Sequence, residues 1–469
     1  MARISLCMIV KDEEAMLADC LASARGGVDE MIVVDTGSKD ATKSLARAAG
    51  ARVFDFVWCN DFAAARNEAL RHALGDWVLV LDADERIAAG SAPRLRSAVK
   101  RAKFDVGLLP LHNAARLDAS VAEVLSGAAR EGEINYVPRL LRNTDGLVYG
   151  DPVHENVTAW LQRRGTRVNG IDVPIVHFGA TKEVVDARNK IERNRTLLAV
   201  RIDRNPADFE AYGYLAHECL RAGAVDEGYD VAARGWQHVA RSQDFSAVHR
   251  LATVRSHLQI MRKEYAEGRE TLRVARSFGE NPDFPFLRAY AFESEALHVA
   301  DTAERRKLLE LARDGYRECM RLAGMAFINI FANGCTTWYG ATRLGTTELQ
   351  LSDAAGALRS FEAALRFRSE YEPARLGKAE ATLDCGDALG ALFQLEPLLK
   401  ESLDAWVLAA AAAEKLGRGS DLRLLTRRAM ALLPKGFVGA HRRERLRGLV
   451  SRLRISVAAD ERLTELAPT

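Results

Sequence analysis

Two carboxylates, those of Asp82 and Asp84, directly follow the apolar run from Trp77 to Leu81. The length and composition of this run predict a strand that is covered on both faces. Open α/β sheets bind ligands beyond the carboxyl ends of their strands. Two carboxylates at such an end can hold a divalent cation, which in turn can clamp a diphosphate. A simpler interpretation, in which the aspartates only cap a loop, stays open at this point.

The sequence before this pair alternates between strand-like and helix-like segments. We predict strands at residues 4–10, 30–34 and 51–56, and helices at 16–24 and 62–74. This alternation is typical of a parallel sheet with right-handed crossovers. Asp35 follows the second of these strands, so it would lie on the same rim as Asp82 and Asp84. One acid could then bind a base or ribose while the pair holds a metal ion.

Four blocks, in this order along the chain, resemble a known family. They are Ser5–Glu13, Val34–Ser38, Phe62–Asn67 and Leu81–Glu85. Together they closely resemble the family-2 inverting glycosyltransferases with the GT-A fold. They are most similar to the members that are fused to tetratricopeptide repeats, among them the sublancin-type peptide S-glycosyltransferases. The resemblance implies an α/β GT-A (Rossmann-like) nucleotide-sugar domain, which we expect over residues 1–185.

The resemblance also implies a set of donor and metal contacts. In the family, the acid that matches Asp35 contacts the nucleotide base, and the Asp-x-Asp binds Mn²⁺ or Mg²⁺ together with the diphosphate. We expect donor contacts from Val10, Lys11, Glu13, Asp35, Arg66, Asn67, Asp82, Ala83 and Arg142. We expect metal contacts from Asp82, Asp84 and His177, because GT-A enzymes often complete the metal site with a late histidine. Alternatively, His177 is a satisfied histidine at the domain seam, and Arg142 is only a solvated member of a mixed-charge strand.

The segment Tyr149–Asn156 resembles the family's Val-His-Glu block and supplies the candidate base. An inverting transfer is a single displacement, so it needs a general base near the acceptor and stabilisation of the departing diphosphate. Glu155 is the first candidate for the base and Asp151 the second, while His154 would orient the site or act as a ligand. The alternative is a surface His-Glu pair without a role. The polar segment 118–132 has no clear period, and we predict a loop over the acceptor side.

After Gly179 the strand-like runs end, and amphipathic helices follow. Asp353, Asp387 and Asp421 recur in similar contexts at the 34-residue spacing of tetratricopeptide repeats. Between about residues 281 and 340 the repeat signal is poor. We therefore predict an all-α repeat solenoid. The predicted divisions are residues 186–240, a linking helix and first repeat-like pair, and 241–469, degenerate and then regular repeats.

Such an array suggests a protein or peptide acceptor, since repeat solenoids bind extended peptides on their concave face. The other use is a homodimer through the repeat region. The aromatic cluster formed by 327–333, Trp338 and Tyr339 would serve as a groove or dimer interface, or would only pack between repeats.

Composition narrows the class of protein. The net charge of +2 gives no global attraction to nucleic acid or membrane. The seven cysteines contain no Cys-x-x-Cys pair, which is typical of reduced cytoplasmic proteins. The first residues read as a strand rather than a signal peptide, and no apolar run is long enough to span a membrane.

We therefore expect a cytoplasmic, metal-dependent inverting glycosyltransferase that moves a sugar from a nucleotide-sugar, in particular a UDP-sugar, to a protein or peptide. One alternative keeps this chemistry with a cell-envelope glycan or lipid-linked acceptor. The other is a non-catalytic repeat scaffold for protein binding.

Overall fold

The computed structural model describes residues 2–164, 167–181, 184, 190–241, 245–325, 331–399, 402–431, 442, 445, 448 and 449. The chain forms two compact units, Met1–Arg255 and Ser256–Thr469. The first holds the sheet and the first helices that follow it, and the second is helical. The boundary between the two units does not test the three predicted divisions of the chain, which stay a prediction.

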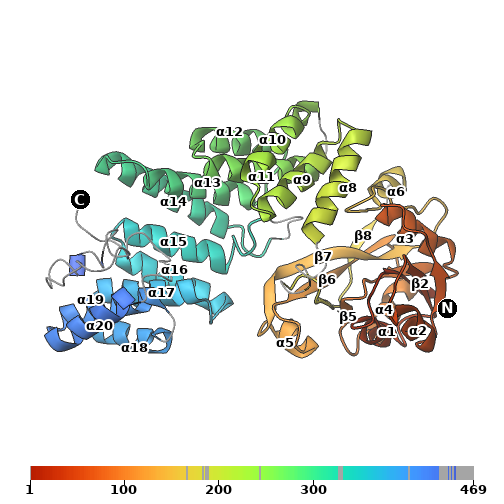
Figure 1. The fold of residues 1–469 in the computed structure, drawn as a ribbon, viewed down its shortest axis with the longest axis horizontal. Coiled ribbons are helices and arrows are strands. Elements are labelled where there is room, and N and C mark those ends of the chain that lie inside the picture. The colour runs from red at the N-terminus through yellow and green to blue at the C-terminus, as the bar shows by residue number, and fades with distance from the viewer. Residues whose placement is uncertain are drawn as a thin grey trace. The chain divides into compact units, whose positions relative to one another are not determined.

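One half of the sheet is parallel, as the alternating pattern predicts (Figure 1). Its strands, in spatial order, are β3 (Arg52–Asp55), β2 (Glu30–Asp35), β1 (Ile4–Val10) and β4 (Trp77–Val80). The crossover helices are α1 (Leu17–Ala24), α2 (Thr42–Ala48) and α3 (Phe62–Arg71). The predicted fold class is confirmed, and the carboxyl ends of β1, β2 and β4 share one edge.

Alternate residues of β1 pack on opposite faces of the sheet, because successive side chains of a strand point to opposite sides. Ile4 and Leu6 join the apolar core under α1 and α4 (Ala92–Lys100). Cys7 joins a second core under α3. Helices therefore cover both faces, as expected for strands that are continuously apolar.

The other half of the sheet is mixed. It contains β5 (Glu85–Ile87), β6 (Val106–Ala114), β7 (Arg130–Arg142), β8 (Val168–Gly170) and β9 (Ile175–His177). β7 runs antiparallel to β4 and β6, while β8 and β9 run parallel to β6. β5 and β9 pair antiparallel and place Glu85 opposite His177.

The prediction of a loop over residues 118–132 is wrong for the described structure. This segment contains α5 (Val121–Ser126) and the start of β7. Ser120 and Glu123 form a reciprocal capping box at the start of α5, and Gly127 closes the helix in a left-handed conformation. The helix is too short to show a period, which explains why the sequence reads as a loop.

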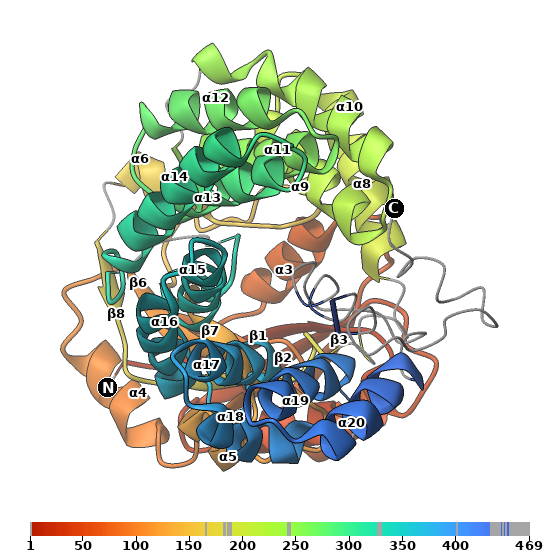
Figure 2. The same ribbon diagram turned by 90° about the vertical axis from the view of Figure 1, so that its left-hand side faces the viewer.

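Helices follow the sheet as a series of hairpins (Figures 1 and 2). In the first unit these are α6 (Thr158–Arg164), α8 (Lys190–Arg204), α9 (Phe209–Arg221) and α10 (Val225–Trp236), and α11 (Phe245–Met261) continues into the second unit. The second unit then has α12 (Tyr265–Arg276), α13 (Asp283–Ala296), α14 (Thr302–Met320), α15 (Trp338–Gln350), α16 (Ala354–Phe367), α17 (Glu372–Asp384), α18 (Ala388–Leu395), α19 (Leu403–Lys415) and α20 (Gly419–Ala431). The short 3-10 turns are Val239–Arg241 and Glu396–Leu398.

The 34-residue spacing has a physical cause at two of its three aspartates. Asp353 and Asp387 each N-cap a helix, and their Oδ1 atoms accept the N–H of Gly356 and Gly390 at 2.8 Å. Asp421 instead lies inside the first turn of α20, so it does not repeat the cap.

Small residues recur where helices cross closely. A Cβ added to Gly345 would stand 2.9 Å from the buried ring of Phe361. The region of poor signal contains the packed pair α13 and α14. Of the predicted aromatic cluster, residues 327–330 lie outside the described residues. None of the helices in the described part of the chain combines the length and apolarity needed to cross a bilayer.

Candidate active site at the carboxyl edge of the sheet

A cavity of about 750 Å³ lies where β1, β2 and β4 end. Ten of the residues predicted for donor, metal or catalysis line it. They are Val10, Lys11, Glu13, Arg66, Asp82, Ala83, Asp84, His154, Glu155 and His177. Asp35, Asn67, Arg142 and Asp151 are not among its lining residues.

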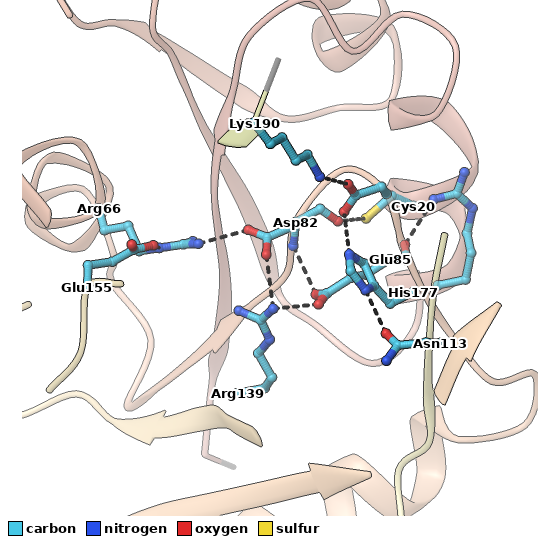
Figure 3. Close-up of polar contacts among 11 residues, drawn as sticks. Cys20, Arg66, Asp82, Glu85, Asn113, Arg139, Glu155, His177 and Lys190 are labelled. Atoms are coloured by element: carbon cyan, nitrogen blue, oxygen red, sulfur yellow. Dashed lines mark hydrogen bonds and ion pairs between the residues drawn. The ribbon is translucent and has the colours of Figure 1, made fainter. Parts of the chain in front are cut away.

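The guanidinium of Arg66 joins two of the acids across this cavity (Figure 3). Its Nε donates to Glu155 Oε1 at 2.6 Å, and its Nη2 donates to Asp82 Oδ1 at 2.8 Å. Arg66 is buried on α3 and the Glu155 side chain is 14% exposed, so this ion pair is largely shielded from water, whereas the Asp82 side chain is 35% exposed. The candidate base and the first aspartate of the Asp-x-Asp are therefore held by one cation.

A second arginine, Arg139 on β7, donates to Asp82 Oδ2 at 2.9 Å and to Glu85. Burial tends to raise the pKa of Asp82, but Arg66 and Arg139 outweigh it and lower that pKa well below its ordinary value. For Glu85 burial prevails over Arg139 and raises the pKa to about 7. Asp82 is thus ionised and paired with two arginines, while Glu85 carries a proton more readily.

Asp84 and His177 meet on the other side of the cavity. His177 Nε2 lies 3.7 Å from Asp84 Oδ1, a position set by the pairing of β5 with β9. His177 Nδ1 contacts Asn113 Oδ1 at 2.9 Å. Since a carbonyl oxygen can only accept, Nδ1 carries the proton and Nε2 offers its lone pair. Burial lowers the pKa of His177 despite Asp84, which favours this neutral imidazole.

The shape and donors of this corner fit a divalent cation. A Cβ on Gly179 would fall 2.0 Å from Asp84 Oδ2 and 2.7 Å from His177 Nε2, so the missing side chain keeps the corner open. A carboxylate oxygen and an imidazole nitrogen are suitable ligands for Mn²⁺. Within the described part of the chain, however, no three His, Cys, Asp or Glu side chains are grouped as a metal site. The part of Asp82 as a third ligand stays a prediction.

The loop that carries His154 and Glu155 is fastened by the helices after the sheet. The ring of His154 stacks on Tyr214 of α9, with centroids 3.7 Å apart. Burial lowers the pKa of His154 to about 3, so this histidine is neutral. Arg201 of α8 donates to the carbonyl of Val153 and lies 3.4 Å from Asp151 Oδ1.

These contacts do not support Asp151 as the base. Its other oxygen accepts from the Asn156 side chain at 3.0 Å. The carboxylate is therefore occupied in holding the loop, whereas Glu155 lines the cavity.

Asp35 lies beside the cavity, next to its lining residue Thr36. Its Oδ1 accepts the N–H groups of Gly37 and Ser38. Its Oδ2 is buried and has no hydrogen-bond partner among the residues that the structure describes. A buried carboxylate oxygen of this kind is suited to a ligand N–H donor.

Two predicted donor residues have other contacts in the structure. The Asn67 amide donates to the carbonyl of Tyr149 and accepts its N–H. Arg142 pairs with Asp105, donates to the Phe104 carbonyl and lies over the ring of Trp77. Neither side chain lines the cavity, since both hold backbone segments together, and their contacts to the donor stay a prediction.

The prediction missed the part of the cavity that comes from α8. Lys190, Arg193 and Asn194 line it, and Lys190 Nζ lies 4.0 Å from Asp84 Oδ2. Their i, i+3, i+4 spacing places them on one helix face. That spacing predicts one polar helix face, but nothing in the local sequence shows that this face meets the cavity.

Known proteins resemble both parts of the chain. Residues 5–118 match the family described as Glycosyl transferase family 2. A TPR repeat-containing protein of Synechococcus elongatus is 35% identical over 246 residues, 50% of this chain and 56% of that protein. An uncharacterized glycosyltransferase of Rickettsia typhi is 38% identical over 88 residues, 19% of this chain and 30% of that protein. The glycosyltransferase SunS of Bacillus subtilis is 26% identical over 99 residues, 21% of this chain and 24% of that protein.

Among solved structures, a tetratricopeptide repeat protein from Parabacteroides merdae aligns with 57% of this chain and 94% of its own, at a TM-score of 0.38 and 11% identity. Glucosyl-3-phosphoglycerate synthase from Mycobacterium tuberculosis aligns with 24% of this chain and 44% of its own, at a TM-score of 0.21 and 25% identity. The chain spans about half the length of the Synechococcus relative and less than a third of the other two. The chain thus carries a glycosyl transferase family 2 domain of the GT-A fold, followed by tetratricopeptide-like helical repeats.

Proposed function

We propose that this protein is a metal-dependent inverting glycosyltransferase that moves a sugar from a UDP-sugar to a polypeptide. The observation that carries the proposal is the cavity at the carboxyl edge of the sheet. It brings Asp82, Asp84, Glu155 and His177 together with the cations Arg66 and Lys190. These are the charges that binding and cleavage of a sugar diphosphate require.

The nucleotide would bind on the side of Asp35. The buried Oδ2 of Asp35 is placed to accept the imide N–H of a uracil ring. Lys11 lines the adjoining part of the cavity. A pyrimidine with a ring N–H is therefore the base that this pocket favours.

The diphosphate would lie between the two sides of the cavity. Asp84 and His177 would hold Mn²⁺ or Mg²⁺, with Asp82 joining them in the predicted set, and the ion would neutralise charge on the phosphate oxygens. Lys190 and Arg193 extend from α8 toward the same space and can neutralise charge on the departing diphosphate.

Glu155 is the proposed base. In the transfer, a nucleophile of the acceptor attacks the anomeric carbon while the bond from that carbon to the diphosphate oxygen breaks, which inverts the configuration. Glu155 takes the proton of the nucleophile. Arg66 fixes the direction of this carboxylate through Nε, as a base within hydrogen-bond reach of its proton must be positioned.

The polypeptide acceptor is supported by the repeats, since arrays of helical hairpins commonly bind extended peptides. A cytoplasmic location is also part of the proposal. All seven cysteines are free thiols and five of them are buried, as in proteins of a reducing compartment.

The test is release of UDP from UDP-glucose, UDP-galactose and UDP-N-acetylglucosamine by the full chain with Mn²⁺. We expect turnover of at least one donor, and loss of most of it in Asp84→Asn. Asp145→Asn changes an exposed aspartate outside the cavity and should keep the wild-type rate. Stereochemistry is read by NMR of the glycosidic product, and a retained anomeric configuration would contradict the displacement.

The acceptor is tested with peptides that offer Ser, Thr, Cys or Asn, and mass spectrometry of the products. Attachment of one hexose to a peptide is the expected result. Donor turnover without any peptide product, but with transfer to a glycan or lipid, would move the acceptor to the cell envelope. If the chain neither released UDP nor bound it, the alternative of a non-catalytic repeat scaffold for protein binding would be favoured.

A further inference from the structure

A second large depression, of about 760 Å³, lies between α4 and β8 in the first unit. Both views place these two elements beside each other (Figures 1 and 2). One of its lining residues, Phe104, packs its ring 5.1 Å from that of Trp77, the first residue of β4. Asp82 follows the other end of β4. This groove is therefore distinct from the cavity at the carboxyl edge.

The groove has an apolar floor and a helical wall. Phe104 and Ile171 are each 7% exposed and form part of the floor. The wall is one face of α4, which contributes Arg94, Ser97 and Ala98, together with Arg101 at the C-cap of this helix. Their spacing of three and four residues keeps them on one side of the helix, while Leu95 and Val99 pack into the core.

The rim is strongly basic. Arg94, Arg101, Lys103 and Arg167 line the groove together with a single acid, Asp172. Asp172 pairs with Arg94 at 3.5 Å. The other three cations are exposed and form no ion pair with any residue that the structure describes. The whole chain has a net charge of only +2, so this excess of positive charge is local.

The opposite wall is the edge strand β8. Among the described strands it pairs only with β6. Val106 donates to the carbonyl of Arg167, and Ile171 donates to that of Leu108. In a parallel pair, the backbone groups of successive residues point alternately toward the partner strand and away from it. Since Arg167 and Ile171 bond to β6, Val168 and Gly170 direct their N–H and C=O groups toward the open edge. Val168 is 50% exposed.

We propose that this groove binds an extended acidic segment of a partner protein, which adds to β8 as a further strand. The free edge supplies backbone hydrogen bonds. Alternate side chains of the added strand would enter the apolar floor, and carboxylates would face Arg101, Lys103 and Arg167. A polyphosphate or nucleic acid would use the cations but neither the strand edge nor the floor, which is why we favour a polypeptide.

The test uses a fluorescent, end-blocked peptide of alternating valine and glutamate with the full chain. Binding is measured by fluorescence anisotropy. We expect the double change Arg101→Glu and Lys103→Glu to weaken binding at least about tenfold, since attraction becomes repulsion at two rim positions. We expect Val168→Pro to weaken it several-fold, because it removes one outward N–H and leaves the ladder to β6 intact.

Matched controls separate the two causes. Gly170→Ala keeps both backbone groups and its Cβ meets nothing within 4 Å, so binding should be unchanged. All variants should keep the UDP-sugar turnover of the wild type, since none lies in the carboxyl-edge cavity. A peptide with lysine in place of glutamate should not bind.

Three results would overturn the proposal. One is no binding of the acidic peptide. Another is binding that survives the double charge reversal. The third is binding that Val168→Pro leaves intact while inorganic polyphosphate or single-stranded DNA displaces the peptide, because that would show a polyanion site without strand addition.

Discussion

Glu155 accepts a hydrogen bond of 2.6 Å from Arg66 Nε, although 89 residues separate the two along the chain. The same guanidinium holds Asp82 through Nη2. One planar cation thus links the candidate base to the first aspartate of the Asp-x-Asp. The donor and acceptor sides of the cavity are therefore positioned together.

Arg66→Lys should lower kcat/KM for UDP-sugar turnover by about 100-fold. The ammonium of lysine keeps the charge but cannot donate to two carboxylates at fixed angles as the planar guanidinium does. Loss of one positioned hydrogen-bond donor in an active site costs about this much. The measurement is UDP release under Mn²⁺ at a range of donor concentrations.

Arg71 provides the control on the same helix. Its side chain is 71% exposed and pairs with Glu68 one turn away. Arg71→Lys should therefore leave kcat/KM unchanged. An equal loss in both variants would show that α3 is merely destabilised, and no loss in Arg66→Lys would remove the bridge from the mechanism.

Asp35→Asn should weaken UDP binding about tenfold or more. The asparagine can keep the two backbone contacts of Oδ1, but its amide presents a donor where Oδ2 offers an acceptor. A hydrogen bond to a charged group contributes about 1.5–3 kcal/mol. Isothermal titration with UDP measures the change.

Asp55 stands opposite Asp35 in the neighbouring strand and is 71% exposed in its ion pair with Lys43. Asp55→Asn should bind UDP like the wild type. Unchanged affinity for UDP in Asp35→Asn would show that the uracil ring binds elsewhere.

Glu85→Gln should change how stability depends on pH. In the folded protein the pKa of Glu85 is raised from 4.5 to about 7, so in that window the folded state holds a proton that the unfolded chain has released. Stability of the wild type must then fall as pH rises from 4.5 to 7. The effect is of the order of a few kcal/mol, since one pKa unit corresponds to about 1.4 kcal/mol.

Urea unfolding at pH 5 and pH 7.5 measures this dependence. The glutamine variant should lack the Glu85 contribution, so its stability relative to the wild type should improve toward pH 7.5. Glu192→Gln removes an exposed carboxylate, so the free energy of unfolding of this variant should depend on pH as that of the wild type does. Parallel curves for Glu85→Gln would mean that Arg139 keeps Glu85 ionised throughout.

The strands of the parallel half could be predicted because their apolar runs are continuous and their ends carry the acids. Asp82, Asp84 and Asp35 follow from that pattern alone. The contacts of Asn67 and Asp151 could not be predicted, since their partners lie far away along the chain. Asn67 bonds to the backbone of Tyr149, 82 residues away, and Asp151 faces Arg201 of α8.

The same limit explains the missed contribution of α8. Its pattern is that of an amphipathic helix, and nothing local shows that its polar face meets the cavity. Lys190 reaches Asp84 only because β9 and Gly179 bring the chain back to the edge of the sheet. The repeats, in contrast, could be predicted, because the helix caps that mark them at Asp353 and Asp387 are local contacts between residues three positions apart.

Asp353→Ala and Asp387→Ala should each lower the free energy of unfolding of the repeats by about 0.5–2 kcal/mol, because each removes the acceptor of a helix N-cap. Both carboxylates accept a glycine N–H at 2.8 Å. Asp421→Ala, at the same spacing, should cost less, since Asp421 lies within the first turn of α20 and acts there only through the helix dipole. Thermal unfolding of the full chain measures all three, and an equal loss at Asp421 would show that the third repeat is capped like the others.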